Sequence, residues 1–328
     1  MSFVVKSLWE QFFKGYYITG CAVRNRNILY VCARDANPDM DGRLDMFDVE
    51  IPTRFIALYP YLPKYKNTPE QAFGVTYWNE GGMDRPGVGV ALKPVETGLM
   101  FSQNEDGFVK PKGPGGNKPE YIDKGHFPRT QKIKCIEGYA WSVGMGRKIY
   151  KRTDTGQWNK VDTGFPVIES NTDQGFVDLD AFNELDMYAV GGQGDVWQYD
   201  GHQWIMCGFP SNEQLSAVVC APDGNVYIGG EGGNLWVGRE NTWKRVYEGQ
   251  STILWNEMRW FDNKLWLASD YMLKVWDGEV LKRPMDNNKP VVLTGHIDAR
   301  DDILVVAGGH TIDLYDGREW KSIMKPYE

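Results

Sequence analysis

The chain has 328 residues, of which 42% are apolar and 24% are charged, and its formal net charge is −8. This composition is typical of a globular protein that can bury a sizeable core. The sequence contains no block of basic residues, which disfavours a nucleic-acid-binding surface, whereas the acidic balance suits a basic partner or serves solubility alone.

The first residues lack the basic segment and the apolar stretch of a signal peptide, and no run of 18 apolar residues could span a membrane. The cysteines are odd in number and lack C-x-x-C spacing; they are Cys21, Cys32, Cys135, Cys207 and Cys220. Three of them lie in apparent strands, where a free cysteine behaves as a small apolar side chain. We therefore expect a cytoplasmic protein with neither disulfides nor a zinc site.

The N-terminal 130 residues form the less regular part of the chain. Residues 28–32 are predicted to be the second strand of a repeat and residues 44–48 the third, and residues 105–109 look like a looser copy of a later turn unit. Residues 59–69 are rich in proline and tyrosine, and residues 111–119 must form a loop because proline and glycine disrupt helices and strands. Such loops often bind partners, but a tolerated insertion is an equal alternative.

Residues 37–45 read Asn-Pro-Asp-Met-Asp-Gly-Arg-Leu-Asp, with a further aspartate at 48. Alternate oxygen side chains around a glycine resemble the calcium loops of EF-hands and those inside the propeller blades of integrin α-subunits. The resemblance implies a Ca²⁺ site with side-chain oxygens, or a backbone carbonyl from the arginine, supplied by Asn37, Asp39, Asp41, Arg43, Asp45 and Asp48. The first position is Asn, Pro38 stiffens the loop and the twelfth position lacks a glutamate, so an acidic β-turn is the alternative. The Ca²⁺ ion would stabilise a loop, and no other cofactor is expected.

From about residue 131 onward, one pattern returns at a nearly fixed spacing. A bulky residue follows each turn, with steps of 46, 39, 38 and 39 between Trp158, Trp204, Trp243, Leu281 and Trp320. A fixed period of this size indicates a repeat architecture. The periodic tryptophans favour packing between repeats over a role as sugar-stacking platforms.

Each regular repeat contains four strand-sized segments; in the fifth they are residues 215–220, 225–229, 234–237 and 242–247. Asp-Gly pairs mark tight turns between them, and the first two segments are apolar at successive positions, as in strands buried on both faces. Four-stranded sheets packed face to face around an axis bury both faces of such strands. We therefore predict an all-β fold, a single β-propeller over residues 1–328 with seven four-stranded blades. The blades are regular over about 131–328 and loop-decorated over about 1–130, and six or eight blades are alternatives.

No set of residues resembles a catalytic site. The histidines share no metal-ligand spacing, and the sequence has no nucleophile elbow, phosphate-binding loop or dinucleotide fingerprint; the histidines are His126, His202, His296 and His310. The glycine-rich segments at 191–194 and 229–233 recur at blade spacing with no following helix. They are therefore features of hairpins.

The Gly-Gly doublets and aromatic-Asp-Gly turns resemble those of WD40/YVTN-like and kelch-like β-propellers; they begin at Gly191, Gly229, Gly308, Tyr199, Trp276 and Tyr315. The resemblance covers about residues 131–320 and is one of fold, because the WD40 signatures are not regular. Propellers of this kind are also similar to the immunity proteins that bacteria encode beside secreted Rhs or contact-dependent toxins. That resemblance implies a non-catalytic protein that binds and neutralises a toxin, often a basic nuclease.

The loops after the second strands differ from blade to blade, which favours one composite site over several equal ones. We predict a partner-binding site at Asp195, Glu231, Asp270, Tyr271 and His310. Two alternatives stay open: a carbohydrate-binding propeller lectin, and a lyase or hydrolase whose axial site would include Asp35 and the three acidic residues just named. The sequence does not indicate an oligomeric state.

Overall fold

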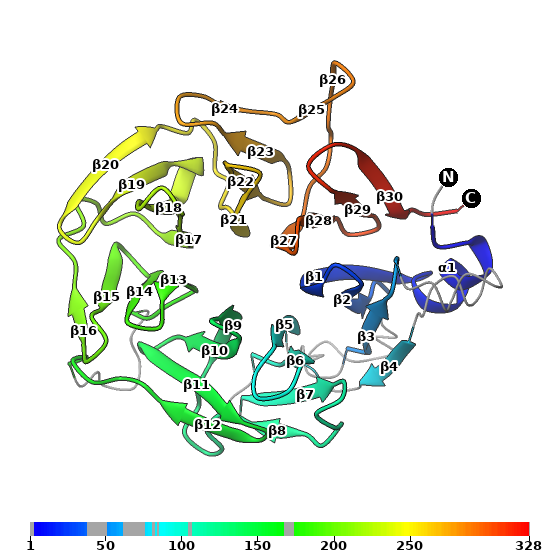
Figure 1. The fold of residues 1–328 in the computed structure, drawn as a ribbon, viewed down its shortest axis with the longest axis horizontal. Coiled ribbons are helices and arrows are strands. Elements are labelled where there is room, and N and C mark those ends of the chain that lie inside the picture. Colours follow the sequence, from blue (N-terminus) through cyan, green and yellow to red (C-terminus); the bar gives the residue numbers. More distant parts are fainter. Residues whose placement is uncertain are drawn as a thin grey trace.

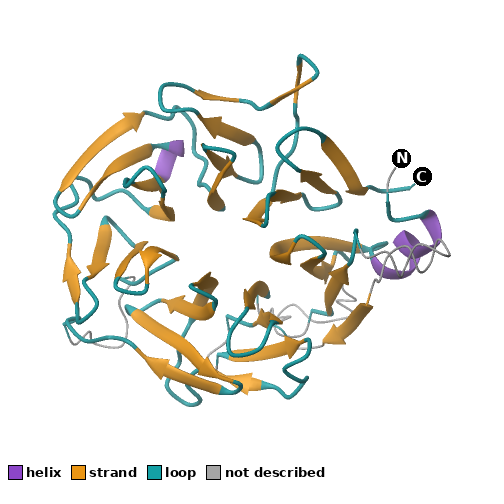
Figure 2. Cartoon of the chain, in the orientation of Figure 1, coloured by secondary structure: helices purple, strands orange, loops and turns teal. Residues whose placement is uncertain are grey.

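The structure is a computed structural model that describes residues 3–37, 51–61, 76–80, 83, 85–103, 107–166 and 174–327. Seven four-stranded antiparallel sheets stand around a central axis, as Figures 1 and 2 show. The predicted all-β propeller with seven blades is confirmed.

Each blade takes four consecutive strands, the first at the axis and the fourth at the rim (Figure 1). The strands of blades 1 to 3 are β1 Tyr16–Asn25, β2 Ile28–Asp35, β3 Thr53–Leu58 and β4 Thr76–Glu80; β5 Gly87–Ala91, β6 Thr97–Phe101, β7 Phe108–Lys112 and β8 Glu120–Tyr121; β9 Thr130–Ile136, β10 Tyr139–Gly144, β11 Lys148–Asp154 and β12 Gln157–Lys160. Those of blades 4 and 5 are β13 Asp178–Asn183, β14 Asp186–Gly191, β15 Asp195–Tyr199 and β16 Trp204–Met206; β17 Leu215–Cys220, β18 Val226–Gly230, β19 Leu235–Arg239 and β20 Thr242–Tyr247.

Blade 6 and blade 7 are separated by a small extra hairpin, β25 Met285–Asp286 and β26 Lys289–Pro290. Their strands are β21 Glu257–Phe261, β22 Lys264–Ala268, β23 Leu273–Trp276 and β24 Leu281–Lys282; β27 His296–Arg300, β28 Ile303–Ala307, β29 Ile312–Tyr315 and β30 Trp320–Met324. The described helical segments are the helix α1 Lys6–Phe12 and the 3₁₀ turn η3 Glu231–Gly233.

The two faces of the ring are built from different connections. Because successive strands of a blade run in opposite directions, the turns between first and second strands and between third and fourth strands emerge on one face, here called the turn face. The connections between second and third strands and between blades emerge on the other, here called the loop face.

The core lies between neighbouring blades. All five residues of the second strand β28 are buried, as are five of the six in β14. Trp266 and Leu273 of blade 6 pack with Ile297 and Leu304 of blade 7 in one apolar cluster. Each blade therefore buries both faces against its neighbours, which explains the continuous apolar pattern of the second strands.

The glycine doublets and the tryptophans also serve packing. At Gly191, the last residue of β14, an added Cβ would lie 2.3 Å from the backbone oxygen of Gly175, so only glycine permits this approach. Trp204 is buried, stacks on Phe165 with ring centroids 5.3 Å apart and donates its indole N–H to the backbone oxygen of Val161. Both features belong to the scaffold.

The N-terminal segment closes the ring between blade 7 and blade 1. The backbone N–H of Val4 donates to the oxygen of Ile323 at 2.8 Å, which adds the segment to the outer strand β30. Leu8 and Phe12 of α1 are buried against the apolar residues of β1, β28 and β30. The two ends of the chain consequently lie side by side (Figure 1).

Three expectations for the irregular blades were wrong. The third strand of blade 1 is β3, not residues 44–48, which lie outside the described residues. Phe108 and Val109 belong to the third strand β7 of blade 2 rather than to a fourth-strand turn unit. The loop expected at 111–119 begins only at Gly113, because Pro111 is part of β7, at a point where β7 has passed its pairing with the short β8. Proline is tolerated at such an unpaired edge.

Candidate functional site

Asp195, the first predicted binding residue, is buried at the start of β15. Arg147 donates to its carboxylate through Nε at 2.9 Å and through Nη2 at 2.9 Å, and the indole N–H of Trp197 donates at 2.7 Å. The carboxylate is therefore already engaged inside the protein.

The other four predicted residues lie on the loop face, in the connections that follow the second strands of blades 5, 6 and 7. Glu231 opens the η3 turn, His310 is exposed, and Tyr271 is 74% exposed. Asp270 accepts a hydrogen bond from Nδ2 of Asn256 at 2.6 Å. The structure places these four residues on one face, and their role in binding stays a prediction.

The calcium-like loop falls almost entirely outside the described residues. Of its six candidate ligands only Asn37 is described, an exposed residue whose backbone N–H donates to Oδ1 of Asp35 at 2.9 Å. Among the described residues, no group of three or more His, Cys, Asp or Glu side chains could hold a metal ion. In the same part of the chain, no helix has the length and apolarity needed to cross a membrane.

Acidic side chains are concentrated on the turn face. Its described turns contain thirteen acidic and four basic side chains: Glu96, Glu137, Glu184, Asp200, Asp223, Glu240, Asp262, Asp277, Glu279, Asp301, Asp302, Asp316 and Glu319, against Arg26, Lys93, Lys118 and Arg318. The described connections of the loop face, with the β25–β26 hairpin, contain seven acidic and six basic side chains: Asp123, Asp162, Glu213, Glu231, Glu248, Asp270 and Asp286, against Arg85, Lys124, Arg129, Arg147, Arg283 and Lys289. The described side chains of the turn face therefore sum to a charge of −9, against −1 for those of the loop face.

Turn geometry explains why aspartates stand there. Asp301 and Asp302 both have positive φ, at 50° and 61°, a left-handed conformation that Asp and Asn adopt more readily than most residues. In the β29–β30 turn, backbone N–H donation from Glu319 and an ion pair with Lys321 lower the pKa of Asp316 to about 2. Its carboxylate is thus charged at neutral pH.

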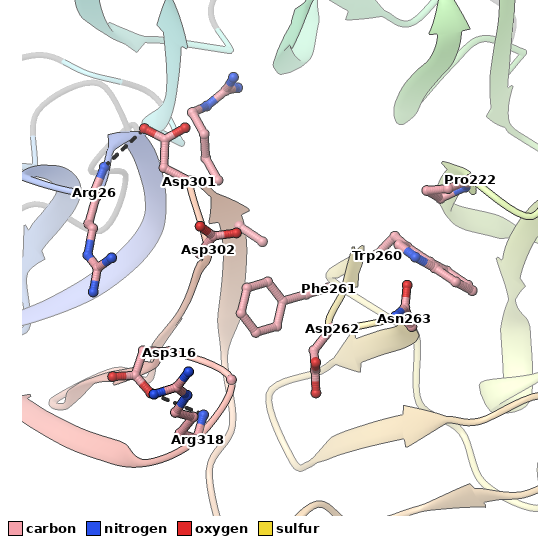
Figure 3. Close-up of a pocket in the computed structure, with 13 residues that line it drawn as sticks. Arg26, Pro222, Trp260, Phe261, Asp262, Asn263, Asp301, Asp302, Asp316 and Arg318 are labelled. Atoms are coloured by element: carbon pink, nitrogen blue, oxygen red, sulfur yellow. Dashed lines mark hydrogen bonds between the residues drawn. The ribbon is translucent and has the colours of Figure 1, made fainter.

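A hollow of about 770 Å³ opens on the turn face, between the turns of blades 5, 6, 7 and 1 (Figure 3). Asp301 and Asp302 stand on one side of it, and Trp260 and Asn263 on another. The half-buried rings of Trp260 and Phe261 supply apolar surface. The hollow thus combines aromatic surface with carboxylates.

A second cavity of about 270 Å³ lies deeper along the axis, between the first strands of the blades. It shares Pro222, Trp260, Ala299 and Arg300 with the hollow, so the two adjoin. Two further cations, Lys134 and Arg259, line the cavity together with the carboxylates Asp180 and Asp298.

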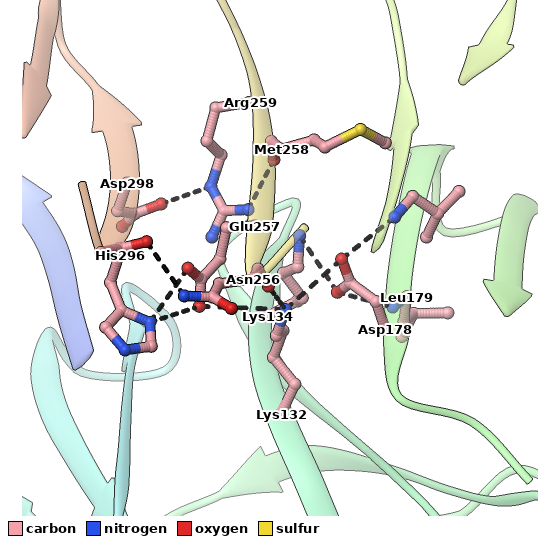
Figure 4. Close-up of polar contacts among 12 residues, drawn as sticks. Lys132, Lys134, Asp178, Leu179, Asn256, Glu257, Met258, Arg259, His296 and Asp298 are labelled. Carbon is pink, nitrogen blue, oxygen red and sulfur yellow. Dashed lines mark hydrogen bonds and ion pairs between the residues drawn. The ribbon is translucent and has the colours of Figure 1, made fainter. Parts of the chain in front are cut away.

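A network of charged groups crosses the axis between blades (Figure 4). Arg259 donates through Nε to Asp298 at 2.7 Å, and Nδ1 of His296 lies 3.0 Å from Glu257. In both pairs the partners are 39 residues apart, so they hold the same position in successive first strands. Asp298 also accepts the backbone N–H of Val23 at 2.7 Å, which ties blade 7 to blade 1.

The charge states in this network depend on the pairing. Burial alone would raise the pKa of Glu257, but His296 and Lys132 lower it to about 2. Burial alone would lower the pKa of His296, but the Glu257 carboxylate raises it above its ordinary value. Asp178 behaves like Glu257, because Lys132 and Lys134 hold its pKa below the usual range despite burial. Most of these ion pairs join neighbouring blades, whereas Lys132 of blade 3 reaches across the axis to Glu257 of blade 6 at 4.0 Å. Together they make a structural polar core.

Sequence reasoning missed the hollow, although a signal for part of it exists. The acidic residue of the turn between first and second strands recurs every 39 residues at Glu184, Asp223, Asp262 and Asp301. An Asp-Gly pair by itself indicates only a hairpin turn. That these turns all lie on one face follows from the blade topology. The axial pairs also carry a signal, because Glu257 and His296, like Arg259 and Asp298, are complementary residues one repeat of 39 residues apart.

The chain was compared with known proteins. No family model matches it. It is 34% identical over 241 residues to the immune protein Tsi7 of Pseudomonas aeruginosa, an alignment that covers 71% of this chain and 78% of that protein.

Solved structures share the fold at low sequence identity. The WD40 β-propeller domain of Doa1 matches with a TM-score of 0.61 at 10% identity, over 90% of both chains. YCF48, solved bound to a D1 peptide, matches with a TM-score of 0.57 at 14% identity, over 92% of both chains. The fold is thus that of WD40-like propellers, and by its sequence the chain belongs to the family of the immune protein Tsi7.

Proposed function

We propose that the chain is an immunity protein that binds a cognate bacterial toxin and neutralises it by direct contact, without catalysis. The observation that carries this proposal is the 34% identity to an immune protein over most of both chains. A propeller suits the role, because its rigid blades present many unlike connections on two faces. The same relationship supports a non-catalytic role over the lectin and enzyme alternatives.

The proposal places the protein in the cytoplasm of the cell that produces it. All five cysteines are free thiols. Burial raises the pKa of Cys32 and of Cys207 to about 12, so both stay in the thiol form at neutral pH. Free buried thiols suit a reducing compartment.

The test is co-expression of the chain with the toxin-like protein encoded by the neighbouring gene. We expect the two proteins to copurify in a fixed ratio, and we expect the chain to restore growth of cells that express the toxin. An unrelated seven-bladed propeller at the same expression level serves as the control and should do neither. Absence of both binding and rescue would contradict the proposal, and a saturable hit on a glycan array would favour the lectin alternative.

A further inference from the structure

We propose that the hollow on the turn face is the docking surface for the toxin, and that its occupant is a basic segment of that protein. The inference rests on the proposed function, since it locates the binding surface for the same partner. It differs from the sequence-based prediction, which placed the site on the loop face.

The shape of the hollow suits a segment of chain with long basic side chains. Its volume of about 770 Å³ admits a loop or several side chains, and it adjoins the axial cavity. The half-buried rings of Trp260 and Phe261 can cover the apolar stems of lysine or arginine. A guanidinium over the Trp260 ring would add a cation–π contact.

The charges of the hollow are available to a partner. Among the described residues, the exposed Asp302 carboxylate has no hydrogen-bond or ion-pair partner, and Asp262 has only the exposed Lys264 at 3.3 Å. Arg26, also in the lining, holds its guanidinium over the Tyr61 ring, 5.4 Å from the centroid. A cationic segment would therefore meet the unpaired carboxylate of Asp302 and the singly paired carboxylate of Asp262, although the lining also contains Arg300 and Arg318.

The surrounding surface adds long-range attraction to the same place. The turn face holds thirteen acidic and four basic side chains among the described residues, whereas the loop face is nearly balanced. A surface whose electrostatic potential has one sign raises the rate of association with an oppositely charged partner. A basic protein is therefore steered to the turn face and held in its hollow.

Three double variants test the location, and each changes the net charge from −8 to −6. D262N/D302N removes two charges from the hollow, and asparagine keeps the left-handed turn conformations of these residues. E240Q/E279Q removes two charges from the same face outside the hollow, and E231Q/E248Q removes two from the loop face. A single variant, R318Q, acts in the opposite direction by removing a cation from the hollow.

Binding is measured by surface plasmon resonance against the purified toxin identified in the co-expression test, at several salt concentrations. We expect D262N/D302N to weaken binding by about tenfold, chiefly through slower association, and both control doubles to weaken it by less than about threefold. R318Q should tighten binding by about twofold. Circular dichroism and urea unfolding verify that each variant folds.

The outcomes separate this inference from the function on which it rests. Equal weakening by D262N/D302N and E240Q/E279Q would overturn the hollow as the docking site. A larger effect of E231Q/E248Q would move the site to the loop face. If the wild-type chain does not bind the toxin, the proposed function fails and the docking site fails with it.

Discussion

At the scale of single residues, position in the ring decides what a charged side chain does. Asp195 and Glu231 both follow second strands, and both were predicted to bind a partner. Asp195 is buried against Arg147 and Trp197, whereas Glu231 is exposed. The difference is invisible in the sequence, because it depends on Arg147 reaching across from the neighbouring blade.

Replacement of Asp195 by alanine tests its structural role. We expect D195A to lower the free energy of unfolding by about 3–5 kcal/mol, because Arg147 would be left buried without its counter-charge. Urea unfolding followed by tryptophan fluorescence measures the change. The matched control E231A, on the exposed residue, should change stability by no more than about 0.5 kcal/mol. Equal effects of the two variants would show that the ion pair contributes nothing.

The Glu257–His296 pair predicts a pH dependence of stability. The pKa of His296 is raised on folding, so the pair stabilises fully below the unfolded pKa of about 6.5, and this contribution is lost as pH rises through the folded pKa. The pKa of Glu257 is lowered to about 2, so its contribution is present above its unfolded value and is lost as pH falls towards 2.

The variant H296Q isolates the contribution of the histidine. We expect the free energy of unfolding of the wild type to fall relative to that of H296Q between pH 6 and pH 9, as the imidazolium is lost. Urea titrations at intervals across this range measure the difference, and His126, His202 and His310 remain in both proteins as an internal control. Parallel curves would contradict the proposed pairing.

At the scale of elements, the regular blades could be predicted and the irregular ones could not. Asp-Gly turns and apolar runs located the four strands of blade 5 within two residues of their bounds. In blade 1 the second and third strands are separated by a long insertion, so the repeat spacing no longer indicates which segment pairs with β2. The pairing of β2 with β3 is a tertiary contact that no local sequence pattern predicts.

The helix α1 is the element that covers the junction of blades 7 and 1, and Leu8 anchors it. We expect L8A to lower the free energy of unfolding by about 2–4 kcal/mol, because it leaves a cavity beside a buried apolar cluster. The control S7A changes an exposed residue of the same helix and should be nearly neutral. If L8A also proved neutral, the helix would not contribute to ring closure.

At the scale of the whole molecule, ring closure makes the point at which the chain begins unimportant for the packing of the blades. The ends meet at β30, where Tyr327 donates its hydroxyl to the backbone oxygen of Val4 at 2.6 Å. The sequence predicted the ring but not this closure, since the contact joins residues more than 300 positions apart. Blade 7 takes all four strands from the C-terminal end, and the N-terminal segment only extends its rim.

A circular permutant tests this view of the ring. Joining the present ends through a short glycine-serine linker and opening the chain between Gln250 and Ser251, in the exposed connection between blades 5 and 6, keeps every blade intact. We expect one cooperative unfolding transition, with a loss of no more than about 2 kcal/mol. A permutant that fails to fold, or that unfolds in separate steps, would show that the position of the chain ends matters to assembly.

The conformation of the turns on the turn face allows the charge of that face to change during evolution. Asp262 and Asp302 stand at left-handed positions where aspartate and asparagine are nearly interchangeable in conformational energy. Single exchanges between aspartate and asparagine can therefore change the charge of the turn face without destabilising the folded ring. Related propellers could then share a melting temperature while their turn faces differ in charge.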